Sequence, residues 1–117
     1  MSDPAFLTIA EALKLIAARK LSPVELTEAY LARIVHLDHL LDSFVTLTAE
    51  RARAEAKVAE AAVMAGKTLG RLHGIPYCLK DIFDTAGIRT TAMSKLLADN
   101  VPARDSFCQE RMVAAGG

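Results

Sequence analysis

The chain has 117 residues, 52% of them apolar, and its 14 basic side chains balance 14 acidic ones. This length fits one domain, and this apolar content excludes a chain that is disordered throughout. Zero net charge argues against nucleic acid as a direct ligand, because phosphate binding needs a basic surplus. No apolar run approaches the roughly 20 residues that span a membrane, and the N-terminus lacks the features of a signal peptide. Two cysteines make a poor disulfide framework, so we expect a cytoplasmic protein.

Three helices are predicted in residues 1–66, which contain no glycine before their last position. The first begins after Thr8, because Thr8–Glu11 has the form of a capping box. The second begins after Ser22, since Ser22–Glu25 supplies a cap, a proline at the first helical position and a glutamate. The third runs from about residue 49 to residue 65, with Thr48 as its cap. The apolar positions expected to face the core in the first two helices are Ile9, Leu13, Ile16, Leu26, Tyr30, Ile34, Leu37 and Leu41.

The sequence changes character in residues 67–117, which hold the remaining glycines. Tyr77–Lys80 is short and apolar, which predicts a buried strand. The residues that follow, up to Thr91, indicate an irregular strand-and-loop segment with a turn at Thr85–Gly87. Asp105 is expected to cap a closing helix over about residues 106–115.

Lys80 is the one residue with a chemical argument of its own. It follows the apolar segment Pro76–Leu79, which we expect to be buried. Burial disfavours the charged ammonium, so the pKa of such a lysine falls and it can serve as a base. The alternative is a lysine that turns its ammonium to water or pairs with Asp81 or Asp84. Composition and spacing alone favour this alternative.

Three other side chains or pairs could carry chemistry. His36 and His39 lie three residues apart on the second helix, but no third ligand is evident, so we expect exposed histidines and no metal or other cofactor. On a strand, Cys78 would face the same way as Lys80, so the pair could form a thiolate nucleophile. We favour the alternative, in which Cys78 is a buried free cysteine. His73 is expected to be structural.

A series of motifs resembles the amidase signature family. Leu72–Pro76 matches its Leu-x-Gly-Ile-Pro segment, Leu79–Asp81 its Val/Leu-Lys-Asp step, and Thr90–Ser94 its Thr-Thr-Ala-Gly-Ser stretch. Upstream, Leu21–Ile34 is similar to the second-helix pattern of the family. Pro102–Asp105 and Ala114–Gly116 fit the helix that follows the motifs. The resemblance covers nearly the whole chain, in order and without a large gap.

The resemblance implies an α/β fold with a large mixed sheet covered by helices on both faces. Residues 1–66 would form a helical layer, and residues 67–117 would supply the first strand or strands, Lys80 and a closing helix. In that family a neutral lysine at the position of Lys80 is hydrogen-bonded to a serine with a cis backbone. This serine relays the proton from a second serine, the nucleophile, which forms an acyl-enzyme. The expected function is therefore amide (C–N) hydrolysis of a small-molecule substrate by a Ser–Ser–Lys triad.

The chain departs from the family pattern in two ways. Met93 stands where the family has glycine, and the Gly/Ser-rich segment that carries both catalytic serines is not in this sequence. We therefore expect residues 1–117 to be the N-terminal part of one amidase domain, inactive alone. We also expect the isolated chain to be marginally stable, self-associated or homodimeric, or rearranged relative to the complete domain. One alternative is a non-catalytic helical packing or association module. Another is part of the amidase-like subunit of a glutamine-dependent tRNA amidotransferase.

Overall fold

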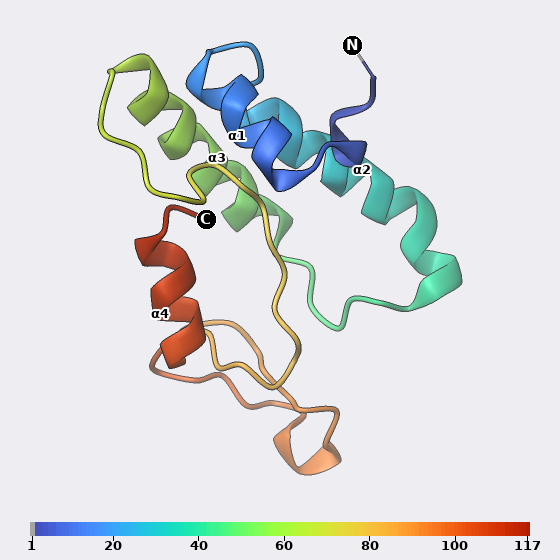
Figure 1. Ribbon diagram of the computed structural model, residues 1–117. Coiled ribbons are helices and arrows are strands. Elements are labelled where there is room, and N and C mark those ends of the chain that lie inside the picture. The colour runs from blue at the N-terminus through green and yellow to red at the C-terminus, as the bar shows by residue number, and fades with distance from the viewer. Residues whose placement is uncertain (1) are drawn as a thin grey trace. The chain divides into compact units, whose positions relative to one another are not determined.

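The computed structural model describes residues 2–117, which form two compact units. The helical unit contains the residues up to Pro76 together with Ala115–Gly117, and the loop unit contains Tyr77–Ala114. The elements of the helical unit are a 3-10 helix, η1 (Pro4–Phe6), and the helices α1 (Ile9–Ala17), α2 (Pro23–Leu41) and α3 (Ala49–Met64) (Figure 1). Those of the loop unit are a 3-10 helix, η2 (Lys95–Leu97), and α4 (Phe107–Ala114).

Helices α1 and α2 begin where the capping boxes predict. The Thr8 hydroxyl accepts from the Glu11 N–H at 3.2 Å, and the Glu11 carboxylate accepts from the Thr8 N–H at 2.8 Å. The hydrogen bonds from Thr8 also hold the pKa of the Glu11 carboxyl below its usual value. At α2, the Ser22 hydroxyl accepts from an early helical N–H, and the Glu25 carboxylate accepts from the Ser22 N–H at 3.0 Å. Both pairs satisfy donors that a helix start leaves free.

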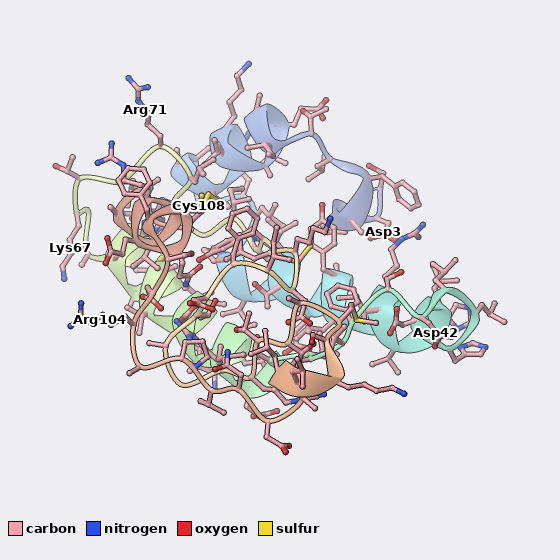
Figure 2. The ribbon with its side chains drawn as sticks, turned by 90° about the horizontal axis from the view of Figure 1, so that it is seen from below. Asp3, Asp42, Lys67, Arg71, Arg104 and Cys108 are labelled. Carbon is pink, nitrogen blue, oxygen red and sulfur yellow. The ribbon has the colours of Figure 1, made fainter. Side chains whose placement is uncertain are left out.

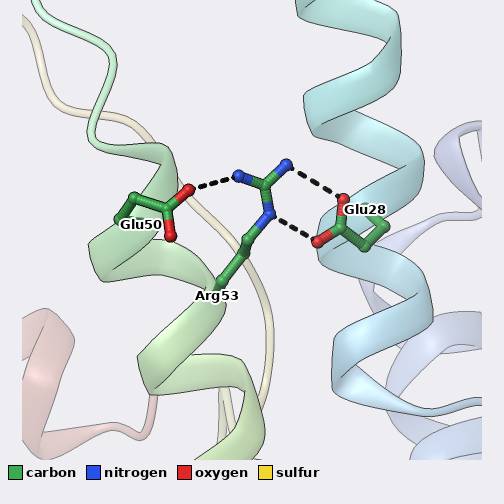
Figure 3. A network of polar contacts seen from close by, with 3 residues as sticks. All are labelled: Glu28, Glu50 and Arg53. Atoms are coloured by element: carbon green, nitrogen blue, oxygen red, sulfur yellow. Dashed lines mark hydrogen bonds and ion pairs between the residues drawn. The ribbon is translucent and has the colours of Figure 1, made fainter.

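Helix α3 starts after Thr48 as predicted, but the Thr48 side chain makes no capping hydrogen bond. Instead, an ion-pair network joins α3 to α2 (Figure 3). Arg53 donates from Nε and Nη2 to the Glu28 carboxylate at 2.7 and 3.3 Å, and from Nη1 to Glu50 at 2.6 Å. The bond from Arg53 lowers the pKa of the Glu28 carboxyl. Because partly exposed ion pairs stabilise little, we expect this network to add only a small amount to the free energy of unfolding.

The helical unit has a small apolar core in which Ile16 and Leu26 are almost fully buried. The phase of the predicted apolar faces is right, but their extent is wrong at the helix ends. Ile9 is 55% exposed and Leu41 66% exposed, because each lies at the end of its helix, beyond the core. Leu31 is buried and was not predicted. The full core cluster consists of Ala12, Ile16, Leu21, Leu26, Val63 and Ile75.

Asp42 and Gly116 are among the residues of the helical unit that adopt left-handed backbone. Asp42, labelled in Figure 2, ends α2 with a φ of 49°. Gly116 has a φ of 94° in the segment that lies along Leu72–Gly74, where the Leu72 N–H donates to the Ala115 carbonyl at 2.8 Å. A Cβ on Gly116 would come within 2.9 Å of the His73 Cα, so this position requires glycine.

The predicted strands are absent from residues 2–117, which contain four α-helices and one isolated bridge, between Thr85 and Ile88. The described chain is thus predominantly helical and does not contain the mixed sheet. Tyr77–Lys80 has the composition of a strand, but in residues 2–117 it is not part of a strand ladder, which a strand needs. The predicted turn is confirmed, because the Ile88 N–H donates to the Thr85 carbonyl at 3.1 Å and Gly87 has a φ of 74°.

The closing helix also differs from its prediction at the start. The Ser106 hydroxyl, not the Asp105 carboxylate, accepts from the Gln109 N–H, at 3.3 Å. Asp105 accepts instead from the Ala86 N–H at 2.7 Å. Asp105 is thus a loop anchor rather than the predicted cap. Among residues 2–117, none of the helices combines the length and apolar content that crossing a bilayer would require.

Replacing Ile16 with alanine is expected to lower the free energy of unfolding by about 2–5 kcal/mol, because the side chain is 1% exposed and its removal leaves a cavity. Ile9→Ala on the same helix is the matched control, and we expect a change of roughly 0.5 kcal/mol or less. Urea unfolding followed by circular dichroism measures both. Equal losses from the two variants would contradict the assigned core.

Candidate active site

Lys80 lies in the loop unit, in a segment without regular secondary structure, and its side chain is exposed. The exposed lysine is the alternative that composition and spacing favour, and the strand that would have buried Lys80 does not form in the described chain. Within residues 2–117, no ion pair joins Lys80 to Asp81 or Asp84. Of the two predicted environments, the structure thus shows the lysine that faces water.

Asp81, the next residue, is bound to a segment ten positions further on. Its carboxylate accepts from the Thr91 N–H at 2.9 Å and from the Thr91 hydroxyl through a second, short hydrogen bond. Its backbone carbonyl accepts from the Ala92 N–H at 2.7 Å. The bonds from Thr91 hold the pKa of the Asp81 carboxyl below its usual value, with smaller help from the Met93 N–H and the charge of Arg89. We call this set of bonds the Asp81–Thr91 clamp.

The far side of the clamp is itself fixed. Thr91 is 3% exposed, and its hydroxyl oxygen also accepts from the Met93 N–H at 3.1 Å. The Thr90 N–H donates to the Asn100 carbonyl, and the Asn100 side-chain amide donates to the Thr90 carbonyl, both at 2.9 Å. The Lys80–Asp81 peptide is therefore attached to a segment that is buried and hydrogen-bonded on both sides.

Met93, the departure from the family pattern, occupies left-handed backbone with a φ of 56°, and Ala92 before it has a φ of 49°. The Met93 side chain is 78% exposed. Glycine adopts this conformation without the steric cost that a Cβ brings. The structure thus gives a conformational reason for glycine at this position.

Two further hydrogen bonds attach the segment around Lys80 to the C-terminal part of the loop unit. The Tyr77 hydroxyl donates to the Gln109 side chain on α4 at 2.8 Å, and Gln109 is 4% exposed. The Asp84 carbonyl accepts from the Ser106 N–H at 2.7 Å. Sequence reasoning missed Gln109, since nothing in the spacing of α4 distinguishes it. It also missed the Asp81–Thr91 pair, although an aspartate and a threonine on either side of a turn glycine are a usable signal.

The remaining candidates have simpler places. His36 and His39 are exposed on α2, and residues 2–117 contain no group of three or more side chains placed to hold a metal ion. Cys78 is free and exposed, so its predicted burial is wrong; Cys108, labelled in Figure 2, is likewise free and exposed. The His73 Nε2 lies 2.9 Å from the Ala59 carbonyl, to which it donates, and this confirms a structural role.

Three serines of the described chain have hydroxyls that are engaged at helix starts. Ser22 and Ser106 lie at helix starts, as predicted. Ser94 begins η2, where its hydroxyl accepts from the Leu96 N–H at 3.2 Å. Each of these three hydroxyls is thus used in capping a helix.

Comparison with known proteins places these residues in a family. A family model described as Amidase matches residues 25–117, which include Lys80 and the clamp. The glutamyl-tRNA(Gln) amidotransferase A subunit of Azotobacter vinelandii is 46% identical over 110 residues, covering 94% of this chain and 23% of that protein. The protein of the same name from Sinorhizobium fredii is 42% identical over 112 residues, or 96% of this chain and 22% of that one.

Solved structures agree with the sequence matches. A chain from a vestigial protein complex, studied for the evolutionary origins of an s-triazine catabolic enzyme, gives a TM-score of 0.90 at 34% identity over 94% of this chain. A bacterial aryl acylamidase of the amidase signature enzymes gives 0.88 at 25% identity over 97%. This chain covers 24% of each of these structures, so it spans about a quarter of the length of the proteins that it matches.

Met93→Gly is expected to raise the free energy of unfolding by about 1 kcal/mol, because glycine removes the cost of a left-handed methionine. Leu96→Gly is the matched control: Leu96 is 96% exposed in η2, outside left-handed backbone, so this change is expected to lower stability slightly. Thermal unfolding compares the two. A destabilised Met93→Gly chain would refute the conformational explanation.

The Asp81–Thr91 clamp predicts a pH dependence of stability. Because folding lowers the pKa of the Asp81 carboxyl from 3.8, its contribution is present above about pH 4 and is lost as the pH falls through the lower, folded value. We expect wild type to be more stable than Asp81→Asn at pH 6 and the difference to shrink below pH 3.8. Urea unfolding at several pH values measures this. A difference that stays constant down to pH 2 would contradict the ionic clamp.

Proposed function

This chain belongs to the amidase family, and we propose that it supplies the helical layer and the general base of an amide-bond (C–N) hydrolase. In this proposal residues 1–66 form the helical layer, and residues 67–117 carry Lys80 and the closing helix. The observation that supports it is the match over residues 25–117, within which Lys80 directly precedes the clamped Asp81. A cytoplasmic location and a small-molecule amide substrate belong to the same proposal.

The proposed chemistry uses Lys80 in its neutral form. Lys80 takes a proton, through a bridging serine, from the serine that attacks the amide carbonyl. The C–N bond then breaks, the proton passes to the departing amine, and the acyl group stays on the serine until water removes it. Both serines would come from the part of an amidase domain that this sequence does not include.

We expect no activity from the 117-residue chain alone, because the two serines of the proposed mechanism are not in this sequence and Lys80 is exposed. Burial favours the neutral form. We infer that Lys80 becomes a base only when the rest of an amidase domain covers it.

Two alternatives remain beside a free-standing amidase. The relatives named as the A subunit of glutamyl-tRNA(Gln) amidotransferase favour the amidase-like component of an amidotransferase, which would bring further subunits as partners. A non-catalytic packing or association module is the other. Exposed apolar side chains in the C-terminal part of α2, namely Val35, Leu40 and Leu41, support self-association or association with a partner in either case.

A chimera tests the catalytic proposal. This chain would replace the matching segment of the Azotobacter vinelandii relative, and ammonia release from glutamine and simple amides would be measured. We expect Lys80→Ala to lower the rate by at least about a hundredfold, since general-base catalysis contributes about 10²–10⁴-fold.

Lys95→Ala is the matched control for this experiment, because Lys95 is another exposed lysine of the loop unit. It should leave the rate unchanged. A folded chimera that hydrolyses amides equally well with and without Lys80 would exclude Lys80 as the base. Hydrolysis by the 117-residue chain alone, abolished by Lys80→Ala, would disprove the expected inactivity.

A further inference from the structure

Lys80 and Asp81 are adjacent, which poses a chemical difficulty for a lysine that must lose its proton. A neighbouring carboxylate stabilises the ammonium form, and in a flexible loop the two side chains of such a pair can meet. Yet the described chain shows no ion pair between them. The reason lies in the contacts of the carboxylate.

Both oxygens of the Asp81 carboxylate are occupied by Thr91. Oδ1 accepts from the backbone N–H at 2.9 Å, and Oδ2 accepts from the hydroxyl. The Thr91 hydroxyl cannot turn away cheaply, because it also accepts from the Met93 N–H and belongs to a residue that is 3% exposed. These two bonds fix the direction of the carboxylate, so that a turn of the Asp81 side chain toward another partner would break them.

We propose that Thr91 is a positioning residue for Lys80: it holds the Asp81 carboxylate away from the Lys80 ammonium and fixes the peptide between the two residues. The functional consequence rests on the proposed role of Lys80 as a base. The geometric claim does not, since it concerns only which group the carboxylate contacts.

The difference between this role and plain loop stabilisation can be measured at the lysine itself. Acylating reagents modify only the neutral amine, so the rate at which Lys80 is acylated at pH 7.5 reports how readily it gives up its proton. Mass spectrometry of peptides from the 117-residue chain gives this rate for each lysine separately, with Lys95 as the internal reference in the same unit.

Thr91→Val is expected to slow the acylation of Lys80 relative to Lys95 by about two- to fivefold, the range that an exposed ion pair produces. Thr91→Ser keeps the hydroxyl and should restore the wild-type rate. The double variant Asp81→Asn/Thr91→Val should also restore it, because an amide cannot pair with the ammonium. A purely structural role for Thr91 predicts no such recovery, since the clamp is broken in the double variant as well.

The proposal is overturned if Thr91→Val leaves the Lys80 rate unchanged, or if the double variant is as slow as Thr91→Val. Should Thr91→Val lose its helical circular dichroism, Asp81→Asn alone decides: the proposal requires that it not slow Lys80. The outcome is independent of the hydrolysis assay, because acylation needs no active enzyme. An inactive chimera would remove the functional consequence and leave the geometric result in place.

Discussion

The loop unit depends on one constraint: its backbone has no strand ladder, so single backbone pairs and side chains must satisfy the polar groups of the main chain. Buried N–H and C=O groups need partners wherever they lie. Asp81 accepts from the Thr91 N–H, Asn100 donates to the Thr90 carbonyl, and Asp105 accepts from the Ala86 N–H. Each of these bonds joins residues ten or more positions apart. The position of the Lys80 peptide follows from them, since Asp81 is one of the three anchors.

The sequence predicts well those features that a few neighbouring residues determine. The capping boxes at Thr8 and Ser22 need only four residues each, and both helices begin where they indicate. The turn at Thr85–Gly87 is local in the same sense, because Gly87 supplies the positive φ that the turn needs. The extent of the core is harder to predict from the sequence. It depends on how α1 and α2 pack against residues far along the chain, such as Val63 and Ile75.

The predicted strand at Tyr77–Lys80 and the predicted burial of Cys78 failed for one shared reason. Tyr77–Lys80 has the apolar composition of a strand, but composition does not supply a second strand to pair with. Without that pairing the segment is a loop, and both Cys78 and Lys80 face water. The identity of Lys80 as the candidate base came from its motif. Its environment, and the partner of the carboxylate beside it, required the structure.

The backbone conformation at position 93 gives a physical reason for the glycine that the family pattern has there. Residues 92 and 93 both adopt positive φ, and this turn brings the Met93 N–H to the Thr91 hydroxyl at 3.1 Å. The bond fixes the direction of that hydroxyl, whose proton then points to the Asp81 carboxylate. The Met93 side chain extends into solvent, so the described chain leaves room for a side chain at this position. Glycine is therefore favoured by backbone conformation, and methionine keeps the same contacts at the cost of local strain.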